Sequence, residues 1–301
     1  MINRHHSLAA AAALAALVLA GPAIAQEKLK VVATFSILAD LVRNVGGDRV
    51  ELATLVGPNG DVHVYSSTPA DARALTAAKV IFTNGLGFEG WIERLAKASG
   101  SKATQVVASK GIKQRQMEDD ARPGRKQTDP HAWQSIANAK VYVANIRDAL
   151  IAADPAGKIT YEANARAFSA KLDALEQEVR DAIAKIPAAR RKIITSHDAF
   201  GYFQAAYGIA FIAPQGVSTE SEPSAADVAK IITQIKREKI PAVFLENVTD
   251  SRLLKRIAEQ GGAKIGGTLY SDALTDEKGN APTYIDMMRH NARQLAAALT
   301  S

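Results

Sequence analysis

One long helical pattern in the middle of the chain, from Ala156 to Ile186, separates two stretches of similar rhythm. The pattern contains no proline and a single glycine, and apolar side chains recur along it at spacings of three and four residues. Pro187 ends it. At 1.5 Å per residue, such a helix spans about 45 Å, enough to run alongside two stacked domains. We therefore expect a rigid linking helix over residues 154–187.

The stretches on either side of this helix both alternate short apolar runs with amphipathic segments. The alternation begins with an apolar run at residues 30–35 and restarts after the helix with another at 193–195. Alternation of this kind is typical of parallel sheets with helices on both faces. The sequence therefore predicts an α/β fold with two (β/α) lobes of mostly parallel sheet, at residues 26–153 and 188–301, joined by the single long backbone helix.

The individual elements follow from apolar periodicity and from turn and capping residues. Thr68 is expected to cap a helix that begins at Pro69, and Ser224 a helix that runs to Glu238. The polar residues 114–128 are expected to form a surface loop. The expected strands are residues 30–35, 50–56, 80–83, 106–108, 193–195, 210–212, 242–245 and 264–269. The other expected helices are residues 38–45, 91–98, 138–150, 251–260 and 283–299.

The first residues predict a secretory signal peptide at residues 1–25. Arg4 supplies a positive charge, residues 8–19 form an apolar run, and Ala-Ile-Ala at 23–25 is a small-residue cleavage site. The run is shorter than the roughly 20 residues that a membrane span needs. We therefore expect cleavage after Ala25 and a mature protein in the periplasm.

Composition narrows the possible partners and sites. The chain has no cysteine, which excludes thiolate metal sites and leaves the core alone to hold the fold. The formal net charge is +6, and no basic motif is interleaved with aromatic residues. We therefore expect no nucleic-acid partner, and we expect a monomer.

Three histidines stand far apart, each beside an aspartate in a stretch of polar and turn residues: His63, His131 and His197. Each follows a predicted strand or precedes a predicted helix, and Asp272 follows the strand predicted at 264–269. Ligands of open α/β sheets collect beyond the carboxyl ends of the strands, so these positions suit a divalent metal site. A lone histidine in a loop is more often a surface or hydrogen-bonded residue, so only the shared position supports this interpretation.

Other polar residues near these positions are expected to have different roles. Asp61, Asp129 and Asp198 are alternative ligands, but their proximity to the histidines favours turn formation or orientation of an imidazole. His290 lies inside the last predicted helix, and we expect it to be structural or solvated.

Four short motifs resemble those of a known family: residues 60–71 around Gly-Asp-Val-His, 129–133 (Asp-Pro-His-Ala-Trp), 196–203 (Ser-His-Asp-Ala-Phe-Gly-Tyr-Phe) and 270–274 (Tyr-Ser-Asp-Ala-Leu). In this order they resemble the metal-specific solute-binding proteins of ABC importers, the cluster A-I family. The resemblance implies two lobes with the metal between them and a membrane permease as partner, with a metallochaperone as a further candidate. The ligands that it implies are His63, His131, His197 and Asp272.

The ligand types bear on the choice of metal. Three imidazoles and one carboxylate suit Zn²⁺, whereas Mn²⁺ favours more oxygen ligands. Family members with glutamate at the third position resemble manganese binders, and this chain has His197 there. Residues 114–128 lack the histidines that many zinc-specific relatives carry in this loop, which favours Mn²⁺ or iron instead. We expect Zn²⁺, with Mn²⁺ or iron as the alternative.

The rival class is an exported zinc hydrolase. Such an enzyme needs an open coordination position and a general base beside the bound water. Asp272 as fourth ligand would close the coordination sphere, and the candidate bases nearest to His197, Glu220 and Glu222, lie in a predicted helix-entry loop. An exported adhesin on the same fold has no sequence feature of its own here. The sequence therefore favours a transport protein and not an enzyme, and its lack of a P-loop places ATP hydrolysis in a separate subunit.

Overall fold

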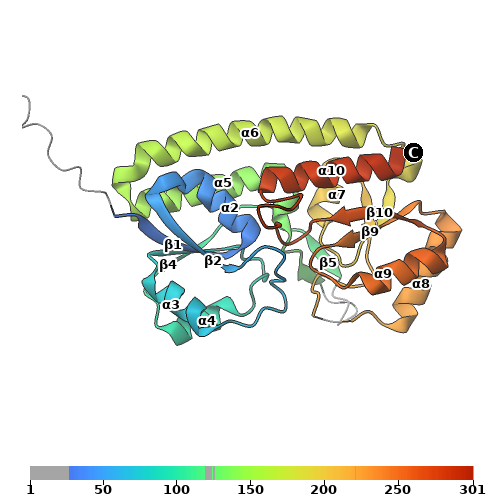
Figure 1. Cartoon of the computed structure of the whole chain (residues 1–301), viewed down its shortest axis with the longest axis horizontal. Helices are drawn as coiled ribbons and strands as arrows, with labels where there is room; N and C mark the ends of the chain where they lie inside the picture. The colour runs from blue at the N-terminus through green and yellow to red at the C-terminus, as the bar shows by residue number, and fades with distance from the viewer. Residues whose placement is uncertain (1–26, 119–123, 125, 221, 301) are drawn as a thin grey trace, which may run out of the picture.

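The computed structural model describes residues 27–118, 124, 126–220 and 222–300. Two α/β halves lie side by side, and a long helix runs along one edge of both (Figure 1). The predicted signal peptide and its cleavage after Ala25 lie outside the described residues. None of the helices in the described part of the chain has the length and apolar character that crossing a bilayer requires.

The first half is built on a four-stranded parallel sheet of order β2-β1-β3-β4. Its strands are β1 (Leu29–Phe35), β2 (Val50–Val56), β3 (Val80–Thr83) and β4 (Thr104–Val107). Its helices are α2 (Ser36–Gly46), α3 (Pro69–Ala77), α4 (Ile92–Ser99) and α5 (Ile136–Ala153). Helices α3 and α4 lie on one side of the sheet, and α2 and α5 lie on the other (Figure 1). Because both faces are covered, the central strands β1 and β3 are largely apolar and buried.

The second half repeats this plan with a four-stranded parallel sheet of order β10-β9-β7-β8. Its strands are β7 (Lys192–Ile194), β8 (Ala210–Ile212), β9 (Ala242–Glu246) and β10 (Lys264–Leu269). Its helices are α7 (Gly201–Tyr207), α8 (Ala225–Glu238), α9 (Ser251–Gly261) and α10 (Tyr284–Thr300). The two parallel sheets confirm the predicted α/β fold class.

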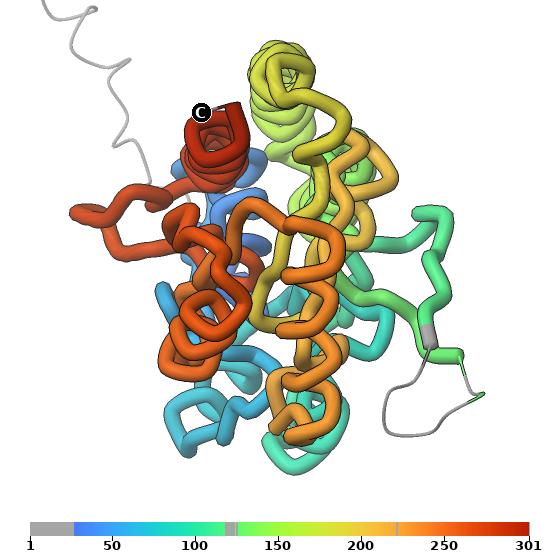
Figure 2. The backbone as a smooth tube through the Cα atoms, turned by 90° about the vertical axis from the view of Figure 1, so that its right-hand side faces the viewer, coloured from blue at the N-terminus to red at the C-terminus, as the bar shows by residue number. Residues whose placement is uncertain are grey.

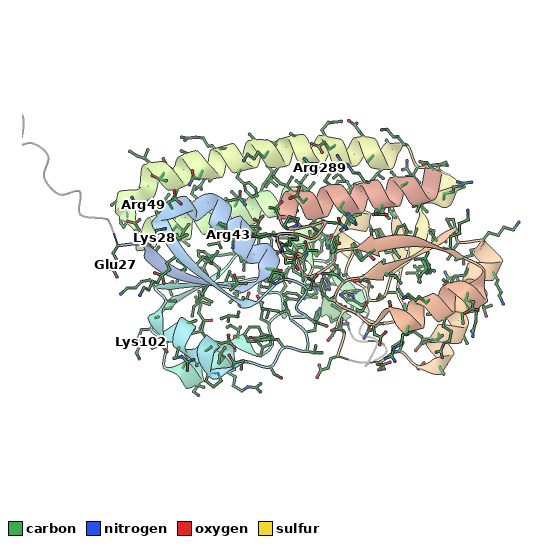
Figure 3. The ribbon with its side chains drawn as sticks, viewed as in Figure 1. Glu27, Lys28, Arg43, Arg49, Lys102 and Arg289 are labelled. Carbon is green, nitrogen blue, oxygen red and sulfur yellow. The ribbon has the colours of Figure 1, made fainter. Side chains whose placement is uncertain are left out.

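The linking helix is α6 (Lys158–Ala184), which has 27 residues and follows a 3-10 turn at Pro155–Gly157. It packs against α2 and α5 of the first half and against α10 of the second. Its buried residues recur every three or four positions, as the sequence pattern predicts. Arg289 of α10, labelled between the two helices in Figure 3, forms an ion pair with Glu178 of α6 at 2.7 Å. The long helix is thereby attached to both halves.

The main hydrophobic core runs through both halves without interruption. It includes Trp133 beside α5, Phe168 of α6 and Tyr284 of α10, all of them buried. A smaller core fills the space between the second sheet and the helices α8 and α9. In an end-on view, α6 and α10 lie next to each other above the sheets (Figure 2). The main core is therefore shared by the two halves.

The helix after the His63 loop begins where capping chemistry predicts. The Thr68 hydroxyl accepts a hydrogen bond from the backbone N–H of Asp71, and the Asp71 carboxylate accepts one from the backbone N–H of Thr68 at 2.6 Å. This reciprocal pair satisfies two N–H groups that a helix start leaves free, and Pro69 fits the first helical turn. The loop at residues 57–67 is thus fixed at its end.

Several expected bounds shift, such as the strand expected at 106–108, which lies at Thr104–Val107 in the structure, and two features were not expected as helix or strand at all. Residues 116–118 and 126–128, expected as loop, form the antiparallel strands β5 (Gln116–Glu118) and β6 (Lys126–Thr128). Helix α7 was not predicted. Both elements are short and lack a long periodic pattern, so tertiary and cross-strand contacts, and not apolar periodicity, determine them.

Candidate metal centre

Four side chains from distant parts of the chain meet between the two halves. They are the side chains of His63, His131, His197 and Asp272, and each offers one ligand atom within 4.8 Å of the others. His63 follows β2, His197 follows β7, Asp272 follows β10, and His131 precedes α5. The strand ends position three of them because parallel strands direct their carboxyl ends toward one edge of a sheet.

The three imidazoles surround a single carboxylate. The Oδ2 atom of Asp272 lies 3.0 Å from Nε2 of His197 and 3.3 Å from Nε2 of His63, and its Oδ1 lies 3.6 Å from Nε2 of His131. The side chains of His131, His197 and Asp272 are fully buried, and that of His63 is 6% exposed. Among the described residues, Nε2 of His63, Nε2 of His131 and Oδ1 of Asp272 have no hydrogen-bond partner. Buried polar atoms without partners are costly, and a bound cation would satisfy them.

Two further carboxylates contact the far nitrogens of two of these imidazoles. Oδ1 of Asp129 lies 3.0 Å from Nδ1 of His131 and also accepts a hydrogen bond from the His131 backbone N–H at 3.0 Å. Oε2 of Glu246 lies 2.7 Å from Nδ1 of His197. Both carboxylates are buried. Carboxylates in this position fix the tautomer and orientation of metal-binding histidines.

Electrostatics at the cluster follow from burial and from this crowding of charges. Burial alone would raise the pKa of Asp272, but the facing imidazoles of His197 and His131 outweigh it and hold that pKa well below its usual range. Burial alone would lower the pKa of His197, but the carboxylates of Glu246 and Asp272 outweigh it and raise that pKa well above its usual value. For His63, burial dominates and lowers the pKa, although Asp272 opposes it.

Aromatic rings close the cluster on the side of the first half. The ring of Phe88 lies edge-on to His63 at 4.9 Å between centroids and 5.9 Å from the ring of His131, which itself lies 5.4 Å from Trp133. The indole N–H of Trp91 donates a hydrogen bond to the Val62 carbonyl at 3.0 Å, directly before His63. These contacts restrict both histidines and keep water from the side of the cluster that they cover.

The remaining candidates lie outside the cluster. Asp61 accepts a hydrogen bond from the backbone N–H of His63 at 2.9 Å, as expected for a turn-forming residue, and its other oxygen accepts one from Thr219 at 2.6 Å. The Asp198 backbone N–H donates to the carbonyl of Gly216 at 3.0 Å, within the second half.

His290 and the two glutamates considered as general bases, Glu220 and Glu222, are also outside the cluster. Nε2 of His290 lies 3.0 Å from the carbonyl oxygen of Thr268, and its ring contacts Tyr270. Glu220 and Glu222 are exposed.

Glu246 is a residue of this region that was not predicted from the sequence. It is the last residue of β9, which lies between β7 and β10 in the second sheet. The position therefore obeys the same carboxyl-end rule that selected His197 and Asp272. The sequence signal that could have identified Glu246 is its place as a carboxylate directly after the strand predicted at 242–245.

Two parallel α/β halves on one long helix, with three buried imidazoles and a carboxylate between them, define a metal-binding solute-binding protein. The chain belongs to the family described as zinc-uptake complex component A, periplasmic, whose model matches residues 31–298. The family resemblance inferred from the four sequence motifs is thereby confirmed. Proteins of this family are substrate-binding components of ABC transporters and are not enzymes.

Relatives and solved structures cover nearly the whole chain. The iron-binding protein YfeA of Yersinia pestis is 34% identical over 282 residues, covering 94% of this chain and 90% of that protein. The manganese ABC transporter substrate-binding lipoprotein PsaA of Streptococcus pneumoniae is 33% identical, covering 91% and 89%. The structure of the periplasmic zinc-binding protein TroA of Treponema pallidum matches with a TM-score of 0.85 at 31% identity, covering 91% of this chain and all of that one. A manganese-bound periplasmic protein of Candidatus Liberibacter asiaticus matches with a TM-score of 0.81 at 30% identity and the same coverage.

Proposed function

We propose that this protein captures one divalent transition metal ion in the periplasm and delivers it to the membrane permease of an ABC importer, with zinc as the physiological metal. The observation that supports this proposal is the convergence of three imidazole Nε2 atoms on the Asp272 carboxylate in a buried site between the two halves. The family membership supports the transport role, and a cleaved leader ending at Ala25 would deliver the protein to the periplasm.

In this proposal the ion is held by His63, His131 and His197 through their Nε2 atoms and by Asp272 through its carboxylate. Zinc prefers four ligands in a tetrahedron at about 2.0–2.1 Å from nitrogen, which places neighbouring ligand atoms about 3.3 Å apart. The candidate ligand atoms lie within 4.8 Å of one another, so a small inward movement of the side chains would complete the site.

The donor set supports zinc over manganese. Three imidazole nitrogens and one carboxylate oxygen bind zinc more tightly than manganese by the Irving–Williams order. Iron and manganese are the alternative metals, because two of the relatives are named for them. The residue that favours zinc in this chain is therefore His197. A glutamate at this position would replace a nitrogen ligand by an oxygen ligand, which suits manganese better.

Capture is favoured over catalysis by the number of ligands. A catalytic zinc keeps one position open for water beside a general base. Four protein ligands would fill the coordination sphere of zinc, and the two glutamates weighed as bases, Glu220 and Glu222, are exposed. Purified metal-loaded protein is expected to show no esterase or peptidase turnover above that of free zinc.

The proposal is tested by metal analysis of the purified protein followed by zinc and manganese competition for the metal-free form. We expect one zinc per chain and tighter binding of zinc than of manganese. Alanine variants of His63, His131 and His197 should lose stoichiometric binding, because three or fewer protein ligands admit water. His290→Ala is the matched control and should bind as the wild type does. Absence of stoichiometric metal would refute the metal-carrier role, and tighter manganese binding would refute the choice of zinc.

A further inference from the structure

The carboxylate of Glu246 contacts one residue of the cluster and its neighbour in the chain. Its Oε1 accepts hydrogen bonds from the backbone N–H groups of Ser196 at 2.7 Å and His197 at 3.0 Å. Its Oε2 lies 2.7 Å from Nδ1 of His197. The side chain is buried at the end of β9. Glu246 therefore contacts both the backbone and the ring of His197.

Both ring nitrogens of His197 face carboxylates. Nδ1 lies 2.7 Å from Oε2 of Glu246 without the alignment of a hydrogen bond, and Nε2 is hydrogen-bonded to Oδ2 of Asp272 at 3.0 Å. A metal ion bound at Nε2 would take the lone pair of that nitrogen. The single hydrogen of the neutral ring would then be on Nδ1, beside a carboxylate oxygen of Glu246 that can accept it. The backbone hydrogen bonds to Oε1 prevent the carboxylate from rotating away.

Asp129 likewise places a carboxylate oxygen beside Nδ1 of His131, at hydrogen-bond distance and geometry, but in a different electrostatic setting. Its second oxygen, Oδ2, lies 3.5 Å from the guanidinium Nε of Arg115, so a cation shares its charge. Within the described part of the chain, no lysine or arginine forms an ion pair with Glu246, whose one ion-pair partner is His197. The negative charge of Glu246 is thus directed at the metal cluster through a single imidazole.

We propose that Glu246 is a positioning residue that holds His197 with Nδ1 protonated and Nε2 presented to the metal, and that its charge strengthens zinc binding. This inference rests on the proposed function. A carboxylate hydrogen-bonded to a ligand imidazole makes the ring a stronger donor, and loss of such partners typically costs 10–100-fold in metal affinity.

The variant Glu246→Gln tests both parts of the inference. A glutamine has one acceptor oxygen, which the two backbone N–H groups would occupy, and this arrangement turns its NH₂ group toward Nδ1 of His197. Two donors then face each other, and the variant also lacks the charge. We expect zinc affinity to fall 10–100-fold in competition titrations. Glu238→Gln is the matched control, because Glu238 pairs with Lys192 on the surface, and its zinc affinity should equal that of the wild type.

A spectroscopic measurement separates positioning from a general loss of structure. In the zinc-saturated wild type, ¹⁵N–¹H correlation spectra should show a downfield Nδ1–H resonance for His197, and in Glu246→Gln this resonance should move upfield or disappear. Glu246→Asp, which keeps the charge, should retain more zinc affinity than Glu246→Gln.

The outcomes distinguish this inference from the proposed function. A wild type that binds no zinc overturns both. A wild type that binds zinc while Glu246→Gln binds equally well overturns the role of Glu246 alone. If Glu246→Gln does not fold, the spectrum of the zinc-saturated wild type still tests the proposal. Zinc bound through Nδ1 of His197, and not through Nε2, would contradict the proposed orientation of the ring.

Discussion

The hydroxyl of Ser36 accepts a hydrogen bond from the backbone N–H of Leu274 at 2.9 Å, across 238 positions of the chain. Ser36 begins α2 in the first half, and Leu274 lies two residues after Asp272. On the other side of Asp272, the carbonyl of Ser271 accepts hydrogen bonds from the side chains of Trp133 and Gln134 at 2.9 and 2.7 Å. The loop that carries Asp272 from the second half is therefore attached to the first half on both sides.

Ser36→Ala should loosen this loop. The buried N–H of Leu274 would lose its acceptor, which costs about 1–3 kcal/mol of unfolding free energy. We also expect faster zinc dissociation, because Asp272 would be less restricted. Urea unfolding measures the first effect, and stopped-flow mixing with a chelator measures the second. Ser224→Ala is the matched control: it removes the cap of α8 at a cost of about 1 kcal/mol and should leave dissociation unchanged. Equal dissociation rates for both variants would contradict the role given to Ser36.

Zinc binding near pH 7 should release a proton from His197. The carboxylates of Glu246 and Asp272 raise the pKa of His197 well above its usual value despite burial, so the metal-free protein carries a proton there at neutral pH. Burial lowers the pKa of His63, so that ring is already neutral. Because a ligand imidazole must be unprotonated, zinc affinity should rise about tenfold per pH unit below the His197 pKa.

This proton release is measured by titration calorimetry in buffers of different ionisation enthalpy. About one proton per zinc is expected at pH 7, and His290→Ala should give the same number. A binding enthalpy that does not depend on the buffer would show that His197 is neutral before the metal arrives.

Asp40 should make the unfolding free energy depend on pH. It is buried on α2, where one oxygen accepts a hydrogen bond from the backbone N–H of Tyr284 at 2.9 Å. Burial raises its pKa from 3.8 to about 6, although the Tyr284 N–H and the exposed Arg43 (Figure 3) oppose the shift. Between these two values the folded protein holds a proton that the unfolded chain lacks. The contribution of Asp40 to stability is therefore present below pH 3.8 and is lost as pH rises through about 6.

Asp40→Asn removes this titration while keeping an acceptor for Tyr284. Relative to the wild type, the metal-free variant should gain about 2–3 kcal/mol of unfolding free energy between pH 4 and pH 8. Urea unfolding across this range measures the difference. Asp48→Asn changes an exposed carboxylate near the end of the same helix and serves as control. A difference between Asp40→Asn and wild type that does not vary with pH would contradict the predicted shift.

Local patterns predicted most of the architecture. The strands expected at 50–56, 80–83, 210–212 and 264–269 have the same bounds in the structure. Apolar periodicity and caps are properties of neighbouring residues, so one sequence suffices to recognise them. The short helix α7 was missed because its position depends on packing and not on a long repeat.

Only some residues of the candidate site could be predicted from such local patterns. The carboxyl-end rule and the family motifs selected His63, His131, His197 and Asp272. Glu246 follows the strand predicted at 242–245, so the carboxyl-end rule applied to it too, but no local spacing marks its contact to His197, 49 positions away. Arg115 was missed because its contact to Asp129 joins residues 14 positions apart, and no local spacing marks that contact either.

Gly201 has no side chain, and the carboxylate of Asp129 lies where a Cβ atom on Gly201 would be in contact with it. Gly201→Ala should therefore disturb the metal centre, although Gly201 is not part of it. A Cβ atom on Gly201, the first residue of α7, would lie 2.5 Å from Oδ2 of Asp129 and 3.1 Å from Nε of Arg115. Asp129 must then move, and His131, which it contacts at 3.0 Å, turns with it. We expect zinc affinity to fall about 10–100-fold, the usual cost of losing a partner of a ligand histidine. Gly90→Ala is the control, since Gly90 is exposed and its Cβ would meet nothing within 4 Å. Equal zinc affinity for both variants, measured by competition titration, would show that Asp129 does not orient His131.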